Sequence, residues 1–62
     1  MNTTQAQLAA AREKGLRIVR LKATGEEGWV TQELNYGFTL RVRIAGATGS
    51  QAVRRVKVDD VE

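Results

Sequence analysis

The stretch from residue 38 to residue 44 constrains the fold of this chain more than any other, because apolar and polar side chains alternate along it without a break. Its sequence is Phe-Thr-Leu-Arg-Val-Arg-Ile. Alternation with a period of two is typical of a β-strand that has one buried side and one solvent-facing side. We therefore expect a strand over 38–44 whose apolar residues point inward, with Arg41 and Arg43 facing outward.

Three further segments carry strand patterns, and loops rich in glycine or in charged residues separate them. We predict strands over 16–22, 29–34 and 52–58, with a last short return at Val61. In the first of these the apolar parity changes between Ile18 and Val19, which indicates a bulge or a strand start there. The predicted core consists of Ile18, Leu21, Val30, Leu34, Phe38, Leu40, Val42, Ile44, Val56, Val58 and Val61.

The first fifteen residues have a different character, because alanine and other good helix formers dominate them. Gly15 suits the left-handed position that follows a helix, with Leu16 packing back onto it. The apolar face holds only Leu8 and alanines, and a helix of roughly ten residues is unstable in water unless it packs. Residues 1–15 are therefore predicted to be a short helix or a flexible arm, ahead of a β domain over 16–62.

The length of 62 residues allows one domain. A chain of this size buries only about 60% of the surface that it exposes when unfolded, so its stability is marginal. Four or five short strands cannot build a two-sheet sandwich here, whereas a strongly bent sheet that closes on itself removes most exposed strand edges. We expect a mainly β fold, a small barrel of four to five antiparallel strands with the N-terminal helix or arm. A marginal monomer and a homodimer that shares its core both stay open.

Missing residue types exclude several kinds of active site. The chain contains no cysteine and no histidine, which rules out disulfides, thiolate zinc sites, Ser-His-Asp triads and Cys-His pairs. The acids gather as Glu26, Glu27 and Glu33 and again at the C-terminus, and neither group has the alternating spacing of a calcium loop. We expect no enzymatic activity, no cofactor and no metal site.

The basic residues are distributed unevenly, although the net charge is only +3. Residues 34–58 hold no acid, and they contain Arg41, Arg43, Arg54, Arg55 and Lys57. A surface polarised in this way attracts anionic partners or orients a charged protein partner. Arginine grips phosphate in bidentate pairs, but lysine and arginine on a sheet face also serve to keep strand edges from aggregating.

Two aromatic residues add candidate contacts. Trp29 has the opposite strand parity to Val30, so we expect it to face outward and either to anchor a partner or to cover the helix or an open end of the fold. Tyr36 lies at the predicted tip of the hairpin between the second and third strands. The candidate contact residues for a protein or a nucleic acid are therefore Trp29, Tyr36, Arg41, Arg43, Arg54, Arg55 and Lys57.

The order of these elements resembles an SH3-like small β-barrel module, of the KOW type and its relatives. The likeness covers 16–62 and rests on the glycine-punctuated turn at 24–30, the hairpin at 34–38 that leads into 40–44, and the ending at 56–62. Modules of this fold bind nucleic acid, bind peptides or dock as small subunits on larger assemblies. The resemblance therefore implies a binding role.

Three non-enzymatic functions stay open. The first, which the modest positive charge favours, is a protein-interaction module: an adaptor, inhibitor or small subunit that docks on a larger assembly through an exposed Trp and basic strand faces. The second is a nucleic-acid-binding module that contacts phosphates through the third and fourth strands. The third is a self-assembling structural barrel. Because no apolar run is long enough to span a membrane and no secretory signal is visible, we expect a cytoplasmic protein without a membrane partner.

Overall fold

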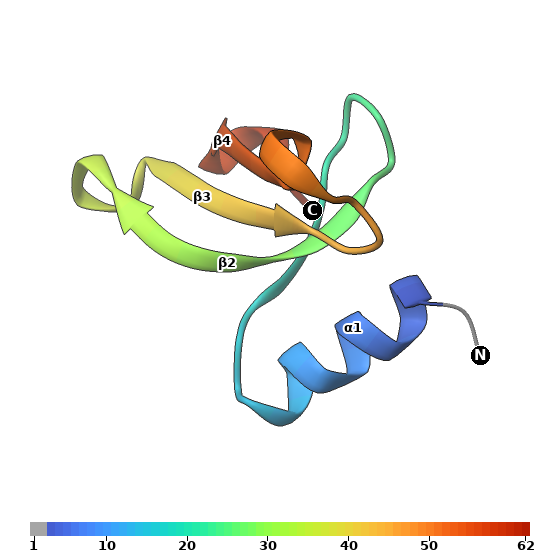
Figure 1. Ribbon diagram of the computed structural model, residues 1–62. Helices are drawn as coiled ribbons and strands as arrows, with labels where there is room; N and C mark the ends of the chain where they lie inside the picture. The colour runs from blue at the N-terminus through green and yellow to red at the C-terminus, as the bar shows by residue number, and fades with distance from the viewer. Residues whose placement is uncertain (1–2) are drawn as a thin grey trace.

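A computed structural model describes residues 3–62 and shows one antiparallel sheet with a helix beside it (Figure 1). The elements, in chain order, are α1 (Thr3–Glu13), β1 (Ile18–Arg20), β2 (Glu27–Leu34), β3 (Thr39–Ile44) and β4 (Val53–Lys57). Short 3₁₀ turns lie between β2 and β3 (Asn35–Gly37), between β3 and β4 (Gly49–Ala52) and after β4 (Val58–Asp60). The expected mainly β fold with an N-terminal helix is therefore confirmed.

Each strand pairs with its neighbour in the chain, in the order β1-β2-β3-β4. The register between β2 and β3 shifts between Val30 and Gln32. A bulge of this kind interrupts the alternation of faces along the strand. Leu34 consequently pairs with Thr39 and is only half-buried, while Val30 packs against the core. The prediction that Val30 and Leu34 share a core face was wrong for this reason.

The sheet is not closed into a barrel. The chain after β4 does return to the far side of the sheet, where Val61 forms an isolated bridge with Leu21. Beside that bridge, Arg20 N–H donates to the carbonyl of Glu62 at 3.3 Å, and Glu62 N–H donates to the carbonyl of Arg20 at 2.8 Å. The predicted return at Val61 therefore exists as a bridge that ties the two ends of the sheet together, and not as a fifth strand.

The hydrophobic core lies on one face of the sheet. Its buried members are Val19, Leu21, Leu40, Val42, Ile44 and Val61, and Val30, Val56 and Val58 are partly buried against them. Val19 lies in the core, and the prediction that Ile18 does so was wrong. Residues two apart along a strand share a face, and the buried face of the first strand is the one that holds Val19 and Leu21. Phe38 was also predicted wrongly: it is 68% exposed, because β3 begins only at Thr39 and leaves Phe38 in the preceding turn.

Helix α1 packs on the sheet, which decides between the docked helix and the flexible arm for residues 3–13. Two of its side chains, Leu8 and Ala11, are buried. The side-chain oxygen of Gln7 accepts a hydrogen bond of 2.8 Å from the backbone N–H of Gly46, in the loop after β3. One apolar contact surface and one polar bond to a distant loop therefore hold the helix in place.

A Schellman motif ends α1, as the glycine after the helical segment predicted. Leu16 N–H bonds to the carbonyl of Ala11 and Gly15 N–H bonds to the carbonyl of Arg12, which is the double pattern of that motif. Gly15 has φ +80°, the left-handed conformation that the motif requires. In the part of the chain that the structure describes, no helix has the length and apolar character needed to cross a membrane.

Candidate functional site

One face of the sheet carries four exposed cations. Arg41 lies directly opposite Arg55 in the pairing of β3 with β4. Residues paired across two strands share a face, and so do residues two apart along one strand. Arg43 and Lys57 therefore lie on this face as well, opposite the face that forms the core. We call Arg41, Arg43, Arg55 and Lys57 the basic face, and all four are exposed.

The pair at the centre of the basic face is electrostatically unfavourable. Side chains directly opposite on antiparallel strands have Cβ atoms about 4.5–5.5 Å apart, and like charges in that position destabilise the sheet. Arg41 Nη1 donates a long bond of 3.5 Å to the side-chain oxygen of Gln32, which is uncharged. Within residues 3–62, no member of the basic face forms an ion pair with a carboxylate. An anion placed between Arg41 and Arg55 would relieve their repulsion.

Arg54 lies on the other face, although it was predicted as a contact residue beside Arg55. Its Nη1 forms an ion pair of 3.2 Å with Oε1 of Glu26, and its Nη2 donates to Oε2 of the same carboxylate at 3.5 Å. Its Nε donates to the carbonyl of Gln51 at 3.1 Å. The structure therefore separates Arg54 from the basic face and uses it to connect β4 to the segment before β2.

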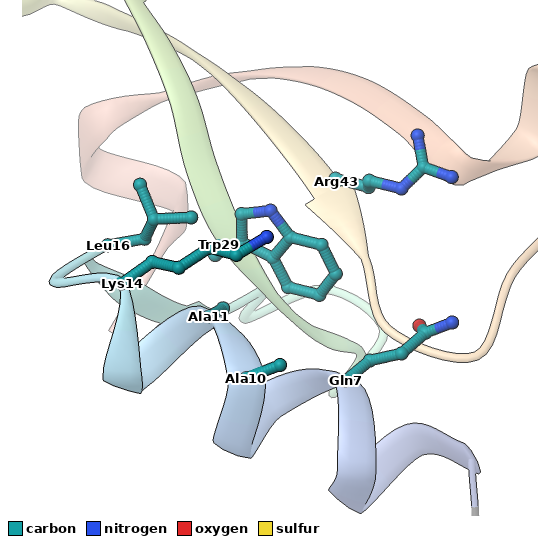
Figure 2. Close-up of a pocket in the computed structure, with 7 residues that line it drawn as sticks. All are labelled: Gln7, Ala10, Ala11, Lys14, Leu16, Trp29 and Arg43. Carbon is teal, nitrogen blue, oxygen red and sulfur yellow. The ribbon is translucent and has the colours of Figure 1, made fainter.

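Trp29 lies in a groove between α1 and the sheet (Figure 2). It is paired with Arg43 across β2 and β3, so it shares the face of the sheet that carries the cations. The groove has a volume of about 220 Å³ and is lined by Gln7, Ala10, Ala11, Lys14, Leu16, Trp29 and Arg43. Trp29 faces outward as its parity predicted, but it is half-buried because α1 covers part of that face.

The tip of the β2–β3 hairpin exposes two aromatic side chains. Tyr36 is fully exposed and Phe38 is 68% exposed. Asn35 and Tyr36 have positive φ values of 56° and 58°. Asparagine adopts this conformation readily in turns, whereas for Tyr36 it costs roughly 1–2 kcal/mol. Strained backbone of this kind gathers at functional sites. Sequence reasoning placed Tyr36 at the tip but missed Phe38, because the alternating pattern runs through Phe38 although the strand does not.

Residues 3–62 contain no group of three or more His, Cys, Asp or Glu side chains arranged to hold a metal ion. Comparison of the chain with known protein families, curated proteins and solved structures finds no significant match. The function is therefore best inferred from the basic face, the Trp29 groove and the aromatic tip themselves.

Proposed function

We propose that this protein is a non-enzymatic nucleic-acid-binding module whose basic face contacts phosphates. The observation that carries the proposal is the direct opposition of Arg41 and Arg55. None of the residues paired with the basic face across the strands is acidic, so the strand register supplies no carboxylate to offset this repulsion. Guanidinium groups bind phosphate oxygens in bidentate geometry, and two opposed groups can share one phosphate. A bound polyanion would attract each of these cations and so offset the repulsion between them.

The spacing of the cations suits a polymer better than a single small anion. Residues two apart on a strand are separated by about 6.6–6.8 Å. Arg41 with Arg43, and Arg55 with Lys57, thus present two parallel pairs of cations along neighbouring strands. Successive phosphates of an extended nucleic-acid strand have a similar separation, so one strand of nucleic acid could contact both pairs.

This proposal reverses the order that the sequence favoured. The sequence favoured protein interaction because the net positive charge is modest, but in the structure four cations gather on one face of the sheet, while Trp29 on the same face is half-buried beside α1. The side chains that this face exposes to solvent include the four cations of the basic face. Modules of the SH3-like fold that the sequence resembles bind nucleic acid, bind peptides or dock as small subunits, so the resemblance supports a binding role of either kind.

Salt dependence tests the proposal. Labelled single-stranded and duplex DNA and RNA are titrated with the protein at several salt concentrations, with fluorescence anisotropy as the measurement. Four phosphate contacts predict a slope of log affinity against log salt of about −2.8 for single strands and about −3.6 for duplex DNA. Absence of binding to every probe at low salt would refute the proposal.

A matched pair of variants locates the contact surface. Arg55→Gln removes a cation from the basic face. Arg54→Gln removes a cation from the preceding position of the same strand, whose side chain lies on the opposite face. We expect Arg55→Gln to weaken binding to single strands and to reduce the salt slope by about 0.7, the value of one contact. Arg54→Gln should leave both nearly unchanged. Equal losses in the two variants would mean that binding follows net charge and not the basic face.

The aromatic tip favours a second candidate function, docking on a protein. Exposed aromatic residues are over-represented among the energetic anchors of protein interfaces, and Tyr36 and Phe38 are both exposed on a strained turn. The test is a pulldown with tagged protein after nuclease treatment. A partner that survives nuclease and Arg55→Gln but is lost with Tyr36→Ala and Phe38→Ala would assign the tip to a protein. Loss of all partners with nuclease would count against this candidate.

A further inference from the structure

The Trp29 groove is continuous with the basic face. Arg43 belongs to both, because it is one of the four cations of the face and also lines the groove. Its cross-strand partner is Trp29 itself. A polyanion that follows the cations of β3 would therefore arrive at the groove through Arg43.

We propose that this groove takes one unpaired base of a single-stranded nucleic acid, stacked on Trp29, while Arg43 and Lys14 contact the phosphates on either side of it. The inference rests on the proposed function and names its substrate class. A single strand is required, because the bases of a duplex are stacked inside it and cannot enter a groove in the protein surface.

The lining of the groove matches the chemistry of a base. The indole of Trp29 and the small side chains of Ala10 and Ala11 supply the apolar part of the lining, and Gln7, Lys14 and Arg43 supply its polar part (Figure 2). Stacking on an aromatic ring tolerates any base, since every base has a π-face. The hydrogen bond from Gly46 to Gln7 holds the α1 side of the groove in position.

The size of the groove argues against a larger small-molecule ligand. Its volume of about 220 Å³ lies below the roughly 300–1,000 Å³ that is typical of pockets for drug-sized ligands and cofactors. A single planar ring system is the kind of group that such a space can accept. The charged remainder of a nucleotide would extend from the groove along the basic face, with Lys14 and Arg43, which line the groove, beside it.

Intrinsic fluorescence provides a direct test, because Trp29 is the only tryptophan of the chain. Three probes are compared at low salt: an oligothymidylate, an abasic strand of the same length, and a duplex. We expect the oligothymidylate to quench Trp29 emission on binding. The abasic strand should bind through the basic face about tenfold more weakly, the value of one stacked base, and without quenching. The duplex should leave the emission unchanged.

The possible failures can be told apart. If the oligothymidylate and the abasic strand bind equally and neither changes the emission of Trp29, the groove inference is overturned while the proposed function stands. If no probe binds, both are overturned.

A second variant pair tests the groove without removing its reporter. Ala10 lines the groove, whereas Ala9 is exposed on the same helix and does not line it. Leucine is nearly as good a helix former as alanine, so both substitutions should preserve α1, which circular dichroism can verify. We expect Ala10→Leu to abolish the tenfold preference for the oligothymidylate while keeping the abasic affinity, and Ala9→Leu to keep both. A preference that persists in Ala10→Leu would overturn the inference.

Discussion

At the scale of single residues, the cations that the proposed function requires lower the stability of the free protein. Arg41 and Arg55 repel each other in the free protein, so either guanidinium makes the sheet less stable than a neutral side chain of similar length would. Residues that lower stability where they also present an exposed charged surface are typical of sites under functional demand. The opposed pair is therefore the residue-level signature of the proposed site.

Replacing Arg55 by glutamine should separate these two effects. We expect Arg55→Gln to raise the free energy of unfolding by about 0.2–1 kcal/mol, because the like-charge pair is removed, while its affinity for single strands falls. Urea denaturation measures the first effect and oligonucleotide titration the second. Arg43→Gln serves as the control, since Arg43 faces Trp29 and Val53 and no cation. A less stable Arg55→Gln would contradict the opposition of the two arginines.

A second residue-level prediction concerns Gly28, which is buried opposite Ile44 in β2. A Cβ at this position would overlap the backbone carbonyl of Arg43, and backbone cannot move aside as a flexible side chain can. Gly28→Ala should lower the free energy of unfolding by about 1–3 kcal/mol, the usual cost of overpacking.

Gly15→Ala offers the comparison for Gly28, because a Cβ there meets no atom within 4 Å. Its cost comes from the positive φ alone, about 1 kcal/mol. Urea denaturation of both variants distinguishes steric overlap from backbone strain. A Gly28→Ala protein as stable as the parent would show that the close approach of β2 to β3 at this point does not exist.

At the scale of elements, α1 depends on the sheet for its existence. A helix of eleven residues is marginal in water by itself, and Leu8 is its only large buried side chain. The helix in turn forms one wall of the groove around Trp29. The docking of α1 and the groove therefore form and disappear together.

Leu8→Ala tests this dependence. We expect loss of about 2 kcal/mol or more of packing free energy, enough to detach α1 and leave the sheet folded. Far-UV circular dichroism should then lose its helical signal, and the emission of Trp29 should shift to longer wavelength as the indole becomes hydrated. Ala9→Leu, which changes an exposed position of the same helix, should alter neither signal. Simultaneous loss of helix and sheet in Leu8→Ala would show that the two unfold as one unit.

At the scale of the whole molecule, the charges of β4 bear on self-association. β4 is an edge strand of the sheet, and three of its five residues are cationic: Arg54, Arg55 and Lys57. Charged side chains on an edge strand oppose pairing with the same strand of another copy. We expect sedimentation to find a monomer and the melting temperature to be independent of protein concentration. A melting temperature that rises with concentration would favour the self-assembling barrel instead.

The strand pattern and the helix stop could be predicted from the sequence because both are local. The alternation over 38–44 correctly placed Leu40, Val42 and Ile44 in the core with the arginines between them on the other face, and Gly15 correctly marked the end of the helix. These features depend on residues within a few positions of one another, and periodicity along the chain is enough to reveal them.

What only the tertiary structure decided depends on how distant segments meet. The bulge in β2 turned Leu34 away from the core, the late start of β3 exposed Phe38, and the docking of α1 made a groove beside Trp29. The opposition of Arg41 and Arg55 likewise follows from the register of β3 with β4. Alternation within each strand indicated that Arg41, Arg43, Arg55 and Lys57 face outward. A shift of one residue in a strand reverses every side chain that follows it, so the local pattern could not specify which of these cations lie directly opposite one another.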